Sequence, residues 1–361
     1  MTWQLQNSKR RERRKRNMLN FEEFQDYTKR VLKDHLPEEL VGATIRTNDV
    51  TKNNGLVLHG VTVQPEGSNI APTIYLDGYY KQYEDGEKLE DVIDRIASVA
   101  EKNAKAPTEI GDIAKTFTNF ENVKDKIIMV VVNTEKNREV LAGMPHQNRE
   151  DLSIIYKVSV GNDEMGMATI AIKNEHMEAW GVTQEEIHNM AMKNTKELLP
   201  VTVQSMNEIM REMFGRDGMP DDMAELMFEE MPMNQQMYVI SNESRINGAA
   251  AMFYEDALSG LAEQMGTDLF ILPSSVHEVI AVSTDMGDPE QLAEMVREVN
   301  GGEVSAEEQL SDHVYRFDAA SRSISLADTT MEQLMDKVSE NTQSYEATQT
   351  MSEGNRPHHR R

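Results

Sequence analysis

The chain has 361 residues, of which 39% are hydrophobic, and this length suffices for two or three domains with buried cores. Its 62 acidic and 37 basic side chains give a formal charge of -25, which disfavours generic binding to nucleic acid and to anionic membranes. The chain has no cysteine, which excludes disulfides, thiolate metal sites and cysteine nucleophiles.

Residues 1–17 differ in charge from the rest of the chain. They carry seven Lys and Arg side chains against Glu12, a net charge of +6, which leaves -31 for the remainder. One interpretation of this block is a nucleic-acid-binding arm, in which residues 9–16 would make the contact. We favour the other interpretation, an upstream extension that results from an early start codon, because an amphipathic helix opens at Met18.

Targeting signals are not evident in the sequence. The basic block is not followed by the apolar core of a signal peptide, and no apolar run approaches the length of a membrane span. We therefore expect a cytoplasmic protein that does not associate with membranes.

Residues 18–120 are predicted to form a helix, antiparallel strands and a second helix. The first helix ends before Pro37, and the turn sequence Asn54-Gly55 predicts a tight hairpin between the strands. The second helix, Leu89–Ala104, has a clear apolar stripe. Tyr79, Tyr80 and Tyr83 cluster just before it and are candidate partner-binding residues; packing at the edge of a core is the alternative.

Residues 121–205 are predicted to form a central module of strands and helices. Lys126–Val132 and Leu152–Val160 are predicted strands, joined through a short helical segment and a turn that contains His146. His146 and Asp151 are weak candidate catalytic residues, and a hydrogen-bonded loop histidine is the alternative. The spacing of histidines and carboxylates does not match a metal site, so we expect neither a metal nor a cofactor.

Residues 206–236 form an acidic, methionine-rich connector. Methionines recur at spacings of three and four and predict apolar stripes on two short helices. Unbranched thioethers adapt to irregular surfaces, so this segment is a candidate binding site for a protein partner. The alternative is a flexible connector whose methionines cover an adjacent domain. The candidate partner-binding methionines are Met219, Met223, Met227 and Met231.

Residues 237–327 are predicted to form a C-terminal α+β module, followed by a polar tail at 328–361 that is disordered at its end. Strand Met237–Ile240 precedes a helix that begins near Ala249 and ends at Gly266, a predicted left-handed C-cap. A hairpin of Leu269–Leu272 and Val276–Val282 follows, then a helix capped by Asp288, and then a final hairpin.

The turn inside the first of these hairpins holds the most suggestive polar residues. Ser274, Ser275, His277 and Glu278 are weak catalytic candidates for a hydrolase of unfamiliar type, together with His146 and Asp151. A Ser-His pair works as nucleophile and base only with an orienting group and an oxyanion hole. The sequence shows neither, and a turn whose serines satisfy backbone groups is the alternative.

Three stretches carry a resemblance to a known family. They are ILPSSVHEVI, the segment Ile172–Thr195 with NEHMEAWGVTQEEI, and MPHQNREDLSIIYKV at Met144–Val158. Together they resemble a bacterial family defined by a domain of unknown function, over about residues 18–326. The resemblance implies no activity, so function must be argued from the residues themselves.

The patterns together predict an α+β protein with antiparallel sheets, packed helices and two to three modules. The sequence lacks a phosphate-binding loop, a dinucleotide-binding glycine motif, a Gly-x-Ser-x-Gly elbow and a His-Glu-x-x-His helix. We therefore expect a non-enzymatic module that binds an unknown protein partner. The alternatives are the hydrolase described above and a nucleic-acid-associated protein tethered by its basic arm.

Overall fold

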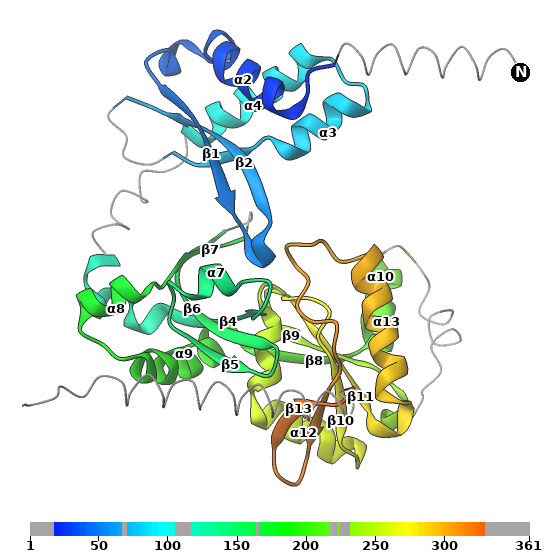
Figure 1. Cartoon of the computed structure of the whole chain (residues 1–361). Helices are drawn as coiled ribbons and strands as arrows, with labels where there is room; N and C mark the ends of the chain where they lie inside the picture. Colours follow the sequence, from blue (N-terminus) through cyan, green and yellow to red (C-terminus); the bar gives the residue numbers. More distant parts are fainter. Residues whose placement is uncertain are drawn as a thin grey trace, which may run out of the picture. The chain divides into compact units, whose positions relative to one another are not determined.

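The computed structural model describes residues 18–66, 71–104, 117–163, 166–216, 218, 223 and 232–328 (Figure 1). The predictions for the basic arm of residues 1–17, for Met219, Met227 and Met231, and for the tail beyond residue 328 lie outside this part of the chain. The predicted α+β class is confirmed: helices pack on sheets whose strands pair antiparallel. No helix in the described ranges is long and apolar enough to cross a membrane.

The chain divides into two compact units. The first unit comprises residues 1–128, 135–145 and 156–191, and the second comprises residues 129–134, 146–155 and 192–361. Strands β4 and β6 contribute residues to both units.

The N-terminal part of the first unit is a three-stranded sheet covered by helices. The strands β1 (Thr44–Thr51), β2 (Val57–Gln64) and β3 (Thr73–Tyr75) lie in that order. Helices α2 (Phe21–Val31), α3 (Asp77–Asp85) and α4 (Leu89–Ala104) complete its core. Helix α2 begins at Phe21 because the Asn20 side chain accepts a hydrogen bond from Glu23 N–H, while the Glu23 carboxylate accepts one from Asn20 N–H.

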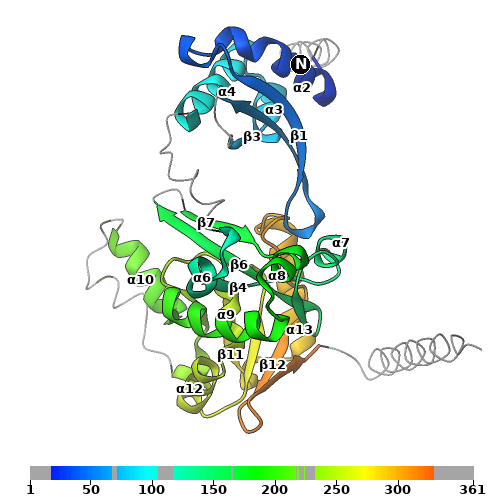
Figure 2. The same cartoon turned by 90° about the vertical axis from the view of Figure 1, so that its left-hand side faces the viewer.

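Strands β1 and β2 form a long hairpin that extends beyond helices α2 and α4 (Figures 1 and 2). The predicted tight turn is confirmed, because Asn54 and Gly55 both have positive φ angles, 60° and 68°. At the hairpin tip, Asn54 N–H donates to Asn137 Oδ1 at 2.9 Å, and Asn137 Nδ2 donates to Asn54 Oδ1 at 3.1 Å. The reciprocal bonds tie the tip to the loop before helix α7 (Arg138–Leu141).

A four-stranded sheet has the order β4 (Ile127–Asn133), β6 (Leu152–Asp163), β5 (His146–Arg149), with β7 (Gly166–Ala171) also paired to β6. Every residue of β4 is buried, in agreement with its continuous apolar sequence. The short helix α6 (Phe120–Val123) precedes β4. Helix α8 (Asn174–Trp180) has Lys173 as its N-cap. A capping box starts α9 (Gln184–Leu198): Glu186 N–H donates to Thr183 Oγ1 at 3.2 Å, and Thr183 N–H donates to Glu186 Oε2 at 2.8 Å.

The second unit contains a six-stranded antiparallel sheet in the order β13-β12-β10-β11-β9-β8 (Figure 1). Five of its strands lie where strands were predicted, although the start of β11 differs. The outer strand β8 (Val201–Ser205) was not predicted, because five residues stabilised by pairing with a distant strand leave little local signal. The other strands are β9 (Tyr238–Asn242), β10 (Leu269–Leu272), β11 (Val279–Ser283), β12 (Tyr315–Asp318) and β13 (Ser323–Leu326).

Helices α10 (Met206–Arg216), α12 (Glu255–Met265) and α13 (Pro289–Gly302) accompany this sheet. Helix α13 packs on one face, where Ala293 and Val296 contact Phe270, Leu272 and Val282. The predicted N-cap Asp288 and the left-handed C-cap Gly266 are confirmed.

Two boundaries in the second unit were wrong. The helix predicted to begin near Ala249 is a buried 3-10 segment, Gly248–Phe253, followed by a separate helix α12. Strand β11 begins at Val279 rather than Val276, so His277 and Glu278 precede the strand and do not occupy its two faces.

Gly248 stands at a close approach of three backbone segments. A Cβ atom on this residue would lie 2.2 Å from Ser241 Oγ and 2.5 Å from the His277 carbonyl oxygen. The Ser241 hydroxyl already donates to that carbonyl at 2.7 Å. Only a residue without a side chain allows the loop before β11 to lie against the end of β9.

We predict that Gly248→Ala lowers the free energy of unfolding by about 1–3 kcal/mol, because the added methyl group must displace backbone and a bonded hydroxyl. Urea unfolding followed by circular dichroism measures the change. The control is Gly260→Ala in helix α12, where the added Cβ meets nothing within 4 Å and helix propensity improves. Equal stability of the two variants would contradict the close approach.

Candidate functional site

The Ser-His turn of the second unit forms hydrogen bonds that differ from those of a nucleophile and its base. Ser275 Oγ accepts a hydrogen bond from His277 N–H at 3.1 Å, as expected for a serine that stabilises a turn. The Ser274 carbonyl accepts from Leu310 N–H at 3.0 Å. The bond from Leu310 joins the turn to the loop before β12.

Both ring nitrogens of His277 have partners. Nδ1 accepts a hydrogen bond from Asn247 N–H at 3.3 Å, so in the neutral ring the proton is on Nε2. Nε2 lies 3.4 Å from Glu308 Oε1. The ring therefore has no lone pair directed at Ser275, which a general base requires. The carboxylate beside His277 is that of Glu308, not that of the adjacent Glu278. Because Glu308 is distant from His277 in the sequence, no local pattern predicted that the two side chains meet.

The loop between β9 and the 3-10 segment, which contacts the His277 ring through Asn247, has a strained backbone. Arg245 and Asn247 both have φ angles of 54°, in the left-handed region that is unfavourable for residues with a side chain. The Asn242 side chain holds the loop: its Oδ1 accepts from Ser244 Oγ at 2.8 Å, and its Nδ2 donates to the Ile246 carbonyl at 2.8 Å.

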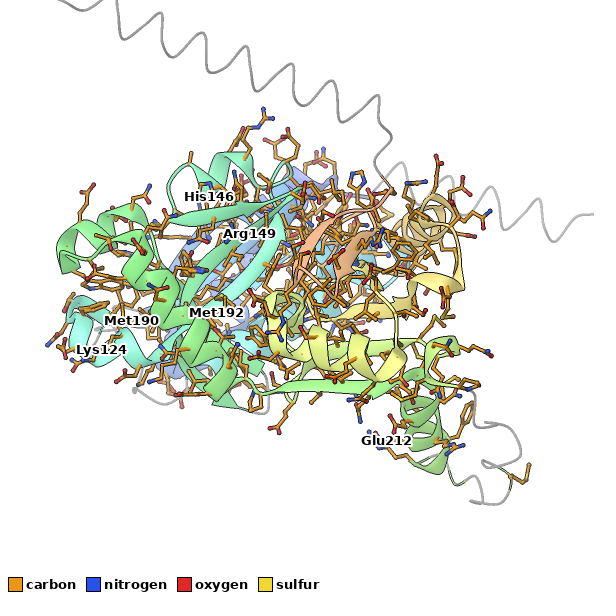
Figure 3. The ribbon with its side chains drawn as sticks, turned by 90° about the horizontal axis from the view of Figure 1, so that it is seen from below. Lys124, His146, Arg149, Met190, Met192 and Glu212 are labelled. Carbon is orange, nitrogen blue, oxygen red and sulfur yellow. The ribbon has the colours of Figure 1, made fainter. Side chains whose placement is uncertain are left out.

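His146 and Asp151 lie at opposite ends of one hairpin. In the β5–β6 register His146 is opposite Ile155, whereas Asp151 lies in the turn that follows Arg149. Figure 3 shows His146 and Arg149 at separate positions along β5. Three residues of strand place His146 roughly 10 Å from the turn, so the two candidate side chains do not form a pair.

Asp151 instead joins a buried hydrogen-bond cluster. One carboxylate oxygen accepts from Ser311 Oγ at 2.7 Å, and the other accepts from the Tyr315 hydroxyl. Burial, reinforced by the Asp151 charge, raises the pKa of the Tyr315 phenol, so the hydroxyl remains a donor. Ser311 N–H donates to the Pro273 carbonyl at 2.9 Å. Asp151 thus holds the loop before β12 in place. Its two hydrogen bonds go to Ser311 and Tyr315, not to His277.

The tyrosine cluster belongs to the core of the first unit. Tyr83 is buried, and its ring stacks on Phe24 with centroids 5.8 Å apart. Its hydroxyl accepts from Leu19 N–H at 3.2 Å, while the Tyr80 hydroxyl donates to the Leu19 carbonyl at 3.3 Å. Tyr79 also packs against this core. Partner binding by Tyr79, Tyr80 and Tyr83 stays a prediction, and the observed contacts are the core packing named as its alternative.

Among the described residues, exposed large hydrophobic side chains are concentrated in one stretch of sequence, from the end of α9 to the start of β9. Among the described residues, fourteen large hydrophobic side chains are exposed, and eight of them fall within residues 198–237. These eight are Leu198, Val201, Val203, Met213, Phe214, Met223, Met233 and Met237. Met223 is the one described member of the four methionines predicted to bind a partner.

Helix α10 has no buried residue, although it carries apolar side chains along its length. A hollow of about 470 Å³ lies beside β8. It is lined by Val203, Ser205, Glu208, Met233, Gln236, Tyr238, Ala257, Gly260, Leu261 and Gln264. Val201 and Val203 were not predicted as binding residues, although the alternation in Val-Thr-Val-Gln-Ser was an available signal of a strand.

A second hollow of about 680 Å³ is lined by polar residues, including Glu263, Asp268, Asp285 and Arg322. Asp268 is already engaged: one oxygen accepts from Ala319 N–H at 3.0 Å, and the other lies 2.6 Å from Arg316 Nη2. These bonds lower the pKa of Asp268, the one from the Ala319 amide most of all. No group of three or more histidine or carboxylate side chains within the described ranges is placed to hold a metal ion.

The comparisons with known proteins support family membership alone. The model of the family described as "Family of unknown function (DUF5688)" matches residues 21–319. The chain belongs to this family. No curated protein and no solved structure matches it. The DUF5688 match agrees with the resemblance inferred from the sequence and assigns no activity.

We predict that Tyr315→Phe lowers the free energy of unfolding by about 1–3 kcal/mol, since a charge-assisted hydrogen bond is lost in a buried setting. Comparison with Asp151→Asn and the double variant gives the coupling energy. The two changes should be clearly non-additive in urea unfolding. Strict additivity would show that the two groups do not interact.

We predict that Asp268→Asn destabilises the protein at pH 7 and destabilises it less at pH 3. The folded pKa of Asp268 is below its unfolded value, so its contribution is present above about pH 4 and is lost as the pH falls. Urea unfolding at both pH values measures the difference. Asp285→Asn removes a carboxylate from the same hollow and serves as the control. A pH-independent loss for Asp268→Asn would contradict the assignment.

Proposed function

We propose that the chain is a protein-binding module whose docking surface lies within residues 198–237 of the second unit. The observation that carries the proposal is the concentration of exposed apolar side chains there: eight of the fourteen found among the described residues occupy this short stretch. Exposed apolar side chains that are concentrated in one region of a protein are a feature of binding surfaces, whereas single exposed apolar residues are common everywhere.

Helix α10 supports this proposal. It has eleven residues, and helices of this length draw most of their stability from packing of an apolar face. Met213 is 60% exposed, and its unbranched thioether adapts to partners of different shape. A partner that covers α10 and Met233 would complete the packing that this helix otherwise lacks.

The geometry offers no comparable support for the alternatives. The His277 ring is engaged by Asn247 N–H and lies beside Glu308, and Asp151 is bound to Ser311 and Tyr315. The basic arm that would tether the chain to nucleic acid lies outside the described residues.

We predict that replacing Met213 and Met233 together by Ser abolishes capture of a stoichiometric partner from native lysate. The loss follows from removal of apolar contact area at the proposed surface, while the free energy of unfolding changes by less than about 0.5 kcal/mol because both residues are exposed. Affinity capture followed by quantitative mass spectrometry is the measurement.

Met295→Ser is the matched control, because Met295 is 55% exposed on helix α13, outside the proposed surface. It should retain the partner. If the double variant captures the same proteins in the same amounts as the unmodified chain, the proposed surface is not the binding surface.

A further inference from the structure

Strand β8 is the outer strand of the six-stranded sheet, and its register shows which of its backbone groups face outward. Pro200 O accepts from Glu243 N–H at 3.2 Å, and Met206 N–H donates to Met237 O at 2.8 Å. Both pairs continue the β8–β9 register, in which Val201 is opposite Asn242 and Ser205 is opposite Tyr238.

Residues of an antiparallel strand alternate between those whose N–H and C=O face one neighbour and those whose groups face the other side. The backbone groups of Pro200 and Met206 face β9, so the alternation directs the backbone groups of Thr202 and Gln204 toward β9 as well. The backbone groups of Val201 and Val203 therefore point away from the sheet. Ser205 is also on the outward side, but its N–H donates to Glu208 Oε2 at 2.8 Å.

The side chains of Val201 and Val203 at this edge are exposed. Val201 and Val203 are each 37% exposed and lie on the same face of the strand. Natural edge strands are protected by proline, lysine or a bulge, and none of these interrupts Val201–Ser205. Val203 also lines the hollow of about 470 Å³, whose other walls include Met233 and Leu261. An added strand would place a side chain opposite Val203 beside this hollow.

The negative charge of the second unit indicates what kind of peptide segment can pair with β8. Residues 192–328 contain 26 acidic and 8 basic side chains, a net charge of -18. Glu208 lines the hollow. Glu212, labelled on α10 in Figure 3, is close to β8, because its Oε1 accepts a hydrogen bond from Gln204 Nε2 at 3.4 Å. Edge-to-edge pairing of two copies would bring two chains of charge -25 together, which is unfavourable.

We propose that β8 binds an extended, basic segment of a partner protein as a seventh strand of this sheet, paired with the backbone of Val201 and Val203. The segment carries an apolar side chain opposite Val203 and basic side chains on its flanks. This inference rests on the proposed binding function and names the partner's chemistry. Such strand addition takes affinity from main-chain hydrogen bonds and specificity from alternate side chains.

The test uses a fluorescein-labelled peptide of alternating Lys and Val, seven residues long, with anisotropy as the readout. The full-length chain should bind it, and a Glu-Val peptide of the same length should bind at least about tenfold more weakly because the protein is acidic. A Lys-Val peptide N-methylated at alternate residues on its pairing edge should also lose at least about tenfold, since those amides no longer donate.

Protein variants test the edge itself. Val203→Pro removes an outward N–H, which edge strands tolerate, and should weaken binding by about tenfold or more while the sheet stays folded. Val203→Thr retains the N–H and should bind within about threefold of the unmodified chain. Thr202→Pro removes an N–H that faces β9 and should lower the unfolding temperature, which checks the assigned alternation independently of binding.

Binding of the N-methylated peptide or of the Val203→Pro variant at full strength would overturn strand addition, as would absence of Lys-Val peptide binding. Equal binding of the Glu-Val peptide would overturn the basic partner. A concentration-dependent dimer that Val203→Pro abolishes would show that a second copy occupies the edge, and would also overturn the proposal. If the peptide experiments fail but the Met213 and Met233 double variant loses the captured partner, the proposed protein-binding function stands and only strand addition is rejected. If the peptide experiments fail and the double variant still captures the partner, both the binding function and strand addition are rejected.

Discussion

The antiparallel pairing of β8 with β9 controls which groups of the second unit remain available to a partner. The register commits Thr202 and Gln204 to the sheet and leaves the backbone of Val201 and Val203 facing outward. It also places the start of α10 at the sheet edge, where Glu208 closes a capping interaction with Ser205. Val201 and Val203 are exposed on this outermost strand, which has a neighbour on one side only within the sheet.

Several polar residues of the second unit hold loops together through hydrogen bonds. The Ser241 hydroxyl, the His277 carbonyl and the missing side chain of Gly248 allow the loop before β11 to approach the end of β9. Asp151 performs a similar role at the loop before β12, through hydrogen bonds from Ser311 and Tyr315. Buried polar groups need partners, and here the partners are each other and the backbone.

The two units differ in how they use aromatic and sulfur-containing side chains. In the first unit, Tyr80 and Tyr83 combine ring packing against Phe24 with hydrogen bonds to the Leu19 backbone, so their polar ends are satisfied within the core. In the second unit, Met213 and Met233 remain exposed. Rigid rings that pack internally stabilise a fold, whereas exposed flexible thioethers provide adaptable contact area.

The sequence by itself determined the α+β class, the hairpin turn at Asn54, the capped helices and family membership, because these depend on local periodicity, turn chemistry and short motifs. The tertiary structure alone decided that Glu308 lies beside His277, that His146 and Asp151 are apart, and that Val201–Ser205 is a strand. These features depend on pairing between residues distant in sequence, and a five-residue strand acquires its conformation from its neighbour rather than from its own composition.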